Sequence, residues 1–273
     1  NCVICHVCIV SNDGESKIPT MKIAVIGANG VVGRACMAEL QKQGCAPIPL
    51  CKSDAIPTDI ERIVLAAPLD SLPFDGPVVD CSRVLKATVL ALPAVQEATT
   101  KQVRTPNCMA SLIAQALHLL HQECIIHSIV ATCMQSASGA GRRGVEALEQ
   151  NSSEELFHGQ LQHNILPHEN ATQEEQSIAN DLQELFGCVA TATSFRVPVH
   201  TGHLASLRVT TKHNIPPSIL QESSHIDPLS LQGTRDVSIG RIRIQKNTAD
   251  LVVCGDQLVC GTAIPAVQLI LGL

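Results

Sequence analysis

The sequence of 273 residues contains no tryptophan, no tyrosine and only four phenylalanines. A core must therefore be built from aliphatic residues and cysteine, and aromatic stacking on a nucleobase is not expected. The chain also has no excess of positive charge: its formal net charge is −6 at pH 7 and its pI is near 6.0. This balance argues against a nucleic-acid partner, so ligand recognition must depend on polar groups.

Long apolar runs are missing as well. No run reaches the roughly 18 to 20 residues that span a bilayer, and no basic segment precedes an apolar one near the start. We therefore expect a soluble, unexported protein with no membrane partner. The 13 cysteines are scattered through apolar segments, which fits a reducing compartment and predicts a cytoplasmic location. Hydrophobic residues make up 45% of the chain, enough for two domains or one large α/β domain.

The first 20 residues do not resemble part of a globular fold. Cys2, Cys5 and His6 form a Cys-x-x-Cys-His pattern typical of haem attachment, and Cys8 extends it toward a metal site. Haem attachment requires export, and a structural metal needs a fourth ligand. We therefore expect an extension without metal or haem, followed by a folded domain that begins at Met21.

A strand, a glycine-rich turn and a helix follow one another from Met21 to Lys42. The turn has the sequence GANGVVG, and its glycines allow a tight bend and the close approach of a pyrophosphate to the helix N-terminus. A purely structural turn is the alternative. The pattern favours dinucleotide binding, through Gly27, Asn29, Gly30, Val31, Val32 and Gly33.

The next apolar strand, residues 46–50, leads into Cys51-Lys52-Ser53. No carboxylate stands at the strand end to bind a ribose 2′-hydroxyl, whereas Lys52 and Ser53 suit a 2′-phosphate. NADP(H) is therefore favoured over NAD, although Asp54 lies nearby. Further short strands at 62–67 and 77–82 predict a parallel, doubly wound sheet that binds ligands at its carboxyl edge.

Pro106-Asn107-Cys108 precedes an apolar run at residues 112–120. This pattern places one thiol at the first turn of a helix, where the helix dipole favours the thiolate. Cys108 is therefore a candidate nucleophile, with an ordinary buried cysteine as the alternative. Partner residues must decide between the two.

Three such partners occur downstream. Gln135 opens a loop of small residues up to Gly144 and offers an amide that can orient a substrate carbonyl. Arg196 suits a substrate carboxylate through bidentate pairing. His203 suits acid–base work, although any single histidine among the 11 of the chain is more often structural.

Six motifs in order resemble those of aspartate-semialdehyde dehydrogenases, from Met21 to the C-terminus. They are GANGVVG at 27–33, PNC at 106–108, QSASGAGRRG at 135–144, RVPVHTGH at 196–203, GRIR at 240–243 and DQLVCGTAIPAVQ at 256–268. The resemblance implies an α/β fold, with a Rossmann-like sheet and a second α+β domain, and a homodimer.

The resemblance also implies an activity: reductive dephosphorylation of L-aspartyl 4-phosphate by NADPH, a step in lysine, threonine, methionine and diaminopimelate biosynthesis. Cys108 would form a thioester, His203 would act as acid–base catalyst and Gln135 would orient the intermediate. Other residues would bind substrate or cofactor. Arg196 would hold the substrate carboxylate, Glu174 the amino group, Asn107 and Lys86 the phosphate, and Ser138, Gly139 and Gln257 the cofactor.

Some positions depart from the family pattern. The chain is short between Asp80 and Cys108, and Lys86 stands where the family has arginine. Ser177 replaces a lysine, and Gln257 an asparagine. Two alternatives therefore remain: a non-catalytic paralogue that keeps the scaffold, and an enzyme of the N-acetylglutamyl-phosphate reductase type. Asn107 and Met109 speak against the second, because that type usually has glycine and tyrosine at these places.

The expected organisation is an extension at 1–20, an NADP-binding domain at 21–105, a catalytic and dimerisation domain at 106–255, and a returning segment at 256–273 with a helix at 263–271. Residues 151–172 are rich in Asn, Gln, His and Ser. We expect a surface loop there, in which His158, His163 and His168 are solvated and bind no metal.

Overall fold

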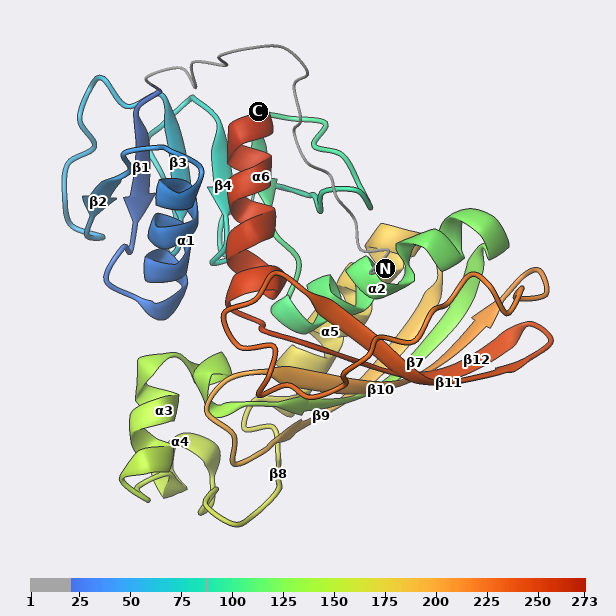
Figure 1. Cartoon of the computed structure of the whole chain (residues 1–273). Helices are drawn as coiled ribbons and strands as arrows, with labels where there is room; N and C mark the ends of the chain where they lie inside the picture. Colours follow the sequence, from blue (N-terminus) through green and yellow to red (C-terminus); the bar gives the residue numbers. More distant parts are fainter. Residues whose placement is uncertain (1–20, 87) are drawn as a thin grey trace. The chain divides into compact units, whose positions relative to one another are not determined.

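The computed structural model describes residues 21–86 and 88–273 (Figure 1). The Cys2-Cys5-His6 motif lies outside them. The chain divides into two compact units, the first formed by residues up to Thr105 together with Thr262–Leu273, and the second by Pro106–Gly261. The return to the first unit thus begins at Thr262, later than the predicted position 256. The reason is that Asp256 accepts backbone N–H groups of Gly233 and Leu258 within the second unit.

The first unit contains six parallel strands in the order β2-β1-β3-β4-β6-β5. Its buried strands are short and rich in valine, isoleucine and leucine, as expected for a parallel sheet. The elements are β1 Ile23–Ile26, α1 Val31–Lys42, β2 Ile48–Leu50, β3 Arg62–Leu65, β4 Val78–Asp80, β5 Val89–Leu90, β6 Gln102–Arg104 and α6 Ile264–Gly272.

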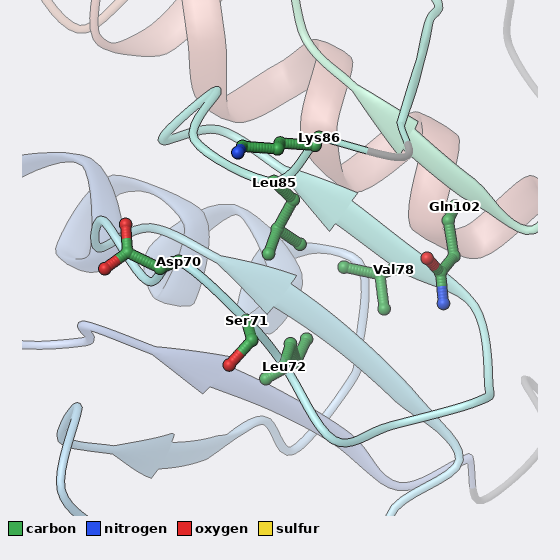
Figure 2. A pocket seen from close by; sticks show the side chains of 7 residues that line it. All are labelled: Asp70, Ser71, Leu72, Val78, Leu85, Lys86 and Gln102. Carbon is green, nitrogen blue, oxygen red and sulfur yellow. The ribbon is translucent and has the colours of Figure 1, made fainter.

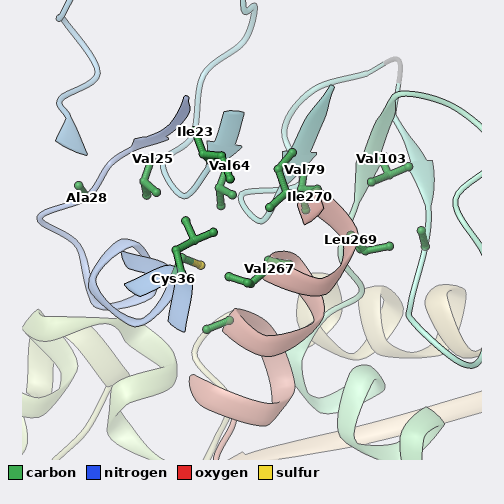
Figure 3. Close-up of a cluster of buried hydrophobic side chains, with 14 residues drawn as sticks. Ile23, Val25, Ala28, Cys36, Val64, Val79, Val103, Val267, Leu269 and Ile270 are labelled. Carbon is green, nitrogen blue, oxygen red and sulfur yellow. The ribbon is translucent and has the colours of Figure 1, made fainter. Parts of the chain in front are cut away.

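Helices α1 and α6 pack against one face of this sheet. Val25, Val64 and Val79 from the strands meet Cys36 of α1 and Val267 of α6 in one buried cluster (Figure 3). The α/β fold class predicted from the sequence is confirmed.

The opposite face of this sheet is covered by side chains of the connecting segments, including Ile56, Leu69 and Phe74. The doubly wound pattern would place helices there. Prolines at 57, 68, 73 and 77 interrupt these connections and disfavour a helix in them.

The second unit contains a mixed sheet in the order β11-β12-β10-β7-β9-β8. The helices α2 and α5 pack on it, α5 against β9 and α2 against β7, β10, β11 and β12. The elements are α2 Cys108–Cys124, β7 Ile126–Gln135, α3 Arg142–Glu149, α4 Glu154–Phe157, β8 Leu166–Pro167, α5 Ala171–Phe186, β9 Val189–Arg196, β10 His203–Thr211, β11 Val237–Gln245 and β12 Thr248–Gly255, with a 3₁₀ turn at Ala137–Ala140 and a π turn at Val259–Ala263.

The prediction of a surface loop at residues 151–172 is wrong only in part, since His158 and His163 are exposed as expected. The segment contains α4 and β8, and Phe157 and Leu161 are buried against Ala137 and Leu148. These two apolar residues anchor an otherwise polar stretch, and His168 is buried rather than solvated. No helix in the described ranges is long and apolar enough to cross a membrane.

Candidate active site

Three predicted site residues lie at one edge of the second sheet. Gln135 ends β7 and Arg196 ends β9, and the two are direct partners in a parallel strand pair. His203 begins β10, which runs antiparallel beside β7. The carboxyl ends of parallel strands and the start of an antiparallel neighbour meet at the same edge, so residues far apart in sequence come together there.

Cys108 is the first residue of α2, and Asn107 is the N-cap of that helix. The Asn107 side-chain oxygen accepts the backbone N–H of Met109 at 2.9 Å. Gly261 packs closely on this helix start, since a Cβ on it would lie 3.1 Å from the Cys108 carbonyl oxygen. Cys108 itself is half-buried, as a nucleophile at a helix N-terminus requires.

Several other cysteines are held as thiols. Burial, with a smaller contribution from the Glu174 carboxylate, raises the pKa of Cys133 to about 12. Burial also raises the pKa of Cys260 to about 12 and that of Cys254 to about 11. Such thiols are unreactive at neutral pH.

Glu174, in the first turn of α5, joins the helix start to the sheet edge. Its Oε1 accepts one hydrogen bond from the Asn107 side-chain amide and another from the Gln135 amide, both at 2.8 Å. The backbone N–H of Asn107 donates to the buried Asp181 carboxylate at 2.6 Å. The side chain of Asn107, predicted to contact phosphate, thus caps α2 and binds Glu174.

The imidazole of His203 is completely buried. Its Nδ1 accepts the backbone N–H of Ser136 at 3.2 Å, so the proton of the neutral ring is on Nε2. Nε2 is buried and has no hydrogen-bond partner among the described residues. Burial, and then the positive charge of Arg196, lower the pKa of His203 to about 3. The ring is therefore a neutral donor at physiological pH.

Gln257 and Ser138 support this histidine. Gln257 accepts the backbone N–H of Gly202, next to His203, at 2.9 Å and donates to the Ser138 hydroxyl at 2.6 Å. The Ser138 and Ser136 hydroxyls are 3.2 Å apart. Both Ser138 and Gln257 are buried. These two predicted cofactor residues thus belong to a buried hydrogen-bond network next to His203.

Gly139 lies against both His203 and Arg196. A Cβ on Gly139 would be 2.7 Å from Arg196 Nη1 and 3.4 Å from His203 Nε2. The first distance is too short for any side chain without displacement of the guanidinium. Glycine is therefore required at this position by close approach.

The glycine-rich loop lies in the first unit. Gly27 has a φ of 85°, and a Cβ on Gly33 would lie 2.1 Å from the Gly27 carbonyl oxygen. Gly30 is the N-cap of α1 and provides no side-chain cap, and the first turn of the helix has no acidic residue. The N–H groups at this helix end can therefore meet an anion.

Two further loops of the first unit carry predicted ligand residues. Lys52 and Ser53 are exposed after β2, and the Asp54 carboxylate accepts the backbone N–H of Cys51 at 2.6 Å. After β4, the buried Asp80 accepts backbone N–H groups within the loop that leads to Lys86. Lys86 is exposed and lines a pocket of about 250 Å³ (Figure 2), together with Asp70, Ser71, Leu72, Val78, Leu85 and Gln102.

A family model described as semialdehyde dehydrogenase, dimerisation domain, matches residues 117–226. The aspartate-semialdehyde dehydrogenase of Rickettsia conorii is 29% identical over 326 residues, covering 90% of this chain and 96% of the relative. That of Rickettsia typhi is 30% identical over 215 residues, covering 65% of this chain and 64% of the relative. Over most of its length the chain is similar to aspartate-semialdehyde dehydrogenases, and the matched dimerisation domain lies within its second unit. Dehydrogenases of this family use a nicotinamide cofactor and small-molecule substrates.

Solved structures of the aspartate-semialdehyde dehydrogenase family share the fold. Aspartate-semialdehyde dehydrogenase II of Vibrio cholerae superposes with a TM-score of 0.78 at 20% identity, covering 91% of this chain and 96% of the other. A probable aspartate-semialdehyde dehydrogenase of Pseudomonas aeruginosa gives 0.79 at 18% identity, covering 91% and 97%. The alignment with the Rickettsia conorii relative is longer than this chain of 273 residues, so the relative has segments that this chain lacks.

Sequence reasoning missed the immediate partners of Arg196. Glu169 binds the guanidinium with both carboxylate oxygens, at 2.6 and 3.2 Å, and His168 Nε2 lies 2.7 Å from Nη2. Both follow β8, whose pairing with β9 places Leu166 beside Arg196. No local pattern marks these residues, because the short strand that positions them has only two residues.

Proposed function

We propose that the chain is a phosphorylating, NADP-dependent dehydrogenase that interconverts an acyl phosphate and its aldehyde through a thioester on Cys108. The family resemblance implies L-aspartyl 4-phosphate as the acyl phosphate. One observation carries the proposal: hydrogen bonds through Asn107, Glu174 and Gln135 connect the start of α2 to the sheet edge that holds the buried Nε2 of His203. A cysteine nucleophile with an organised donor site is what acyl transfer needs.

Residues of the first unit fit NADP(H). The uncapped N-terminus of α1 suits the pyrophosphate, with Gly27 and Gly33 allowing close approach. Lys52 and Ser53 are exposed where a 2′-phosphate would lie, and Asp54 is occupied by the Cys51 N–H. When bound, NADPH would supply the hydride that reduces the thioester.

The residues of the second unit would divide the remaining work. The Cys108 thiolate forms a bond to the acyl carbon while the bond to the phosphate oxygen breaks, and phosphate leaves with that electron pair. The Nε2–H of His203 donates to the oxygen that becomes negatively charged, and Gln135 orients the acyl group. When the carbonyl forms again, the carbon–sulfur bond breaks and the thiolate returns.

The second unit would also form the dimer. The family model that matches it is a dimerisation domain. Val130, Met134 and Val189 are exposed on the face of its sheet that α2 and α5 do not cover. An exposed apolar face of this kind suits association with a second copy. A cytoplasmic location also remains our proposal, supported by ten cysteines among the described residues that form no disulfide.

Reduction of NADP in the presence of aspartate semialdehyde and phosphate or arsenate tests the reaction. We expect turnover that requires the oxyanion and disappears in Cys108→Ala, while the variant keeps its melting temperature and NADP affinity. Turnover that does not depend on phosphate or arsenate would contradict the acyl-phosphate assignment. NADP binding without turnover of any aldehyde would instead support the non-catalytic paralogue, to which Lys86 and Ser177 point.

A further inference from the structure

The guanidinium of Arg196 is almost completely satisfied by the protein itself. Nε and Nη2 donate to the two carboxylate oxygens of Glu169, at 3.2 and 2.6 Å. Nη1 donates to the Ser136 carbonyl oxygen at 2.7 Å, and Nη2 lies 2.7 Å from His168 Nε2. Three of the five N–H groups of an arginine thus donate to oxygen acceptors, and a fourth faces the His168 ring, so that no pair of them is left to grip a second carboxylate.

This ion pair is removed from solvent. The Arg196 side chain is 1% exposed and that of Glu169 is 9% exposed. The ring of Phe157 in α4 covers the guanidinium, with its centroid 5.2 Å from Cζ. Burial raises the pKa of Glu169, but the hydrogen bonds and positive charge of Arg196 outweigh burial. The pKa of Glu169 therefore lies below its usual value. Glu169 is therefore ionised at neutral pH, and its carboxylate neutralises Arg196.

The position of Glu169 follows from the fold. Strand β8 pairs antiparallel with β9, and the backbone N–H of His168 donates to the Ser194 carbonyl oxygen at 3.0 Å. This backbone bond fixes the residue before Glu169, so that the carboxylate reaches the guanidinium at the end of β9. The contact is thus built into the segment that also contributes Phe157 and Leu161 to the core. Glu169 is not a surface side chain that meets Arg196 by chance.

We propose that Glu169 is a specificity-determining residue that takes the place of a substrate carboxylate on Arg196. An acyl group with its own carboxylate must displace Glu169 from the guanidinium before it can bind there. An acyl group without one binds beside an ion pair that is already complete. The site therefore prefers short acyl phosphates and aldehydes that bring no carboxylate to Arg196, in contrast to the L-aspartyl 4-phosphate that the family resemblance implies. This inference rests on the proposed acyl-phosphate reaction.

Two aldehydes that differ only in this group test the inference. Aspartate semialdehyde carries the α-carboxylate, whereas 3-aminopropanal has the same amino group and aldehyde without it. In the wild-type protein, we expect kcat/KM for 3-aminopropanal to equal or exceed that for aspartate semialdehyde. In Glu169→Gln, we expect the ratio of aspartate semialdehyde to 3-aminopropanal to rise about 10-fold, because the guanidinium gains a free edge for a carboxylate.

A binding measurement does not depend on turnover. L-2-Aminobutanoate has the carboxylate and amino group but no aldehyde, and calorimetry should show about 10-fold tighter binding to Glu169→Gln than to the wild-type protein. Glu149→Gln is the matched control, because it removes an exposed carboxylate that does not contact Arg196. Glu149→Gln should leave unchanged both the kcat/KM ratio of the two aldehydes and the affinity for L-2-aminobutanoate.

The outcomes separate the two proposals. A wild-type preference for aspartate semialdehyde that persists or falls in Glu169→Gln overturns the role of Glu169. Absence of phosphate-dependent turnover with both aldehydes overturns the proposed function, and the aminobutanoate titration then still decides the role of Glu169. If Glu169→Gln does not fold, the relative kcat/KM of the wild-type protein for the two aldehydes decides the role of Glu169.

Discussion

Gln257 donates a hydrogen bond from Nε2 to the hydroxyl oxygen of Ser138 over 2.6 Å. The other end of the same amide accepts the backbone N–H of Gly202, immediately before His203. One side chain thus spans two segments that enclose the histidine. Since the carboxamide is buried, both of its bonds exclude water and fix the distance between these segments.

Gln257→Asn should therefore misplace His203. Asparagine is one methylene shorter and cannot make both bonds, so one buried partner is left unsatisfied at a cost of roughly 1–3 kcal/mol. We expect kcat to fall by about 10-fold with KM for the aldehyde nearly unchanged, because the loss falls on catalytic geometry rather than on substrate binding. Steady-state kinetics beside thermal unfolding would measure both effects. A lower melting temperature with unchanged kcat would show that Gln257 is only structural.

Gly139→Ala should lower both the stability and the kcat of the protein, although it adds only one methyl group. The added methyl would lie 2.7 Å from Arg196 Nη1 and 3.3 Å from His203 Cε1, so the guanidinium must shift from its buried contacts. Such overpacking typically costs about 1–3 kcal/mol of stability, and the displaced His203 should lower kcat. Gly272→Ala is the matched control, since its methyl would meet nothing within 4 Å. Equal kinetics and stability of the two variants would refute close packing at Gly139.

Local patterns were sufficient to predict the glycine turn, the helix that starts at Cys108 and the α/β fold class. Each depends on residues close in sequence, such as the Asn107 cap just before Cys108. The candidate site residues Gln135, Arg196 and His203 could be named from motifs, but the sheet register that gathers them could not. Register depends on pairing between distant segments.

The contacts of Arg196 were unpredictable for the same reason. Glu169 lies in a polar stretch that has the composition of a surface loop, and only the burial of Phe157 and Leu161 holds this stretch against the sheet. Composition averages over a segment, whereas two apolar anchors are enough to bury its neighbours. The side chain that completes the site is therefore visible only in three dimensions.

The buried histidines should make stability depend on pH above the range in which carboxylates titrate. Burial and the charge of Arg196 hold the pKa of His203 at about 3, and the same two causes lower the pKa of His168. In the unfolded chain a histidine has a pKa of about 6.5. Between these values the unfolded state binds more protons than the folded state. The free energy of unfolding therefore has its highest value above pH 6.5, as far as these histidines are concerned, and falls as the pH decreases below 6.5.

For His203 alone, the expected loss between pH 8 and pH 5 is about 2 kcal/mol, at about 1.4 kcal/mol for each pH unit below 6.5. Urea unfolding at intervals over this range would measure it, and His203→Asn should remove that part of the slope. His200 is exposed, so His200→Asn should leave the slope intact. A wild-type free energy of unfolding that stays constant from pH 8 to pH 5 would mean that His203 takes up a proton in the folded state. The ring would then be a cation able to pair with the Cys108 thiolate, rather than the neutral Nε2–H donor inferred from its contact with Ser136.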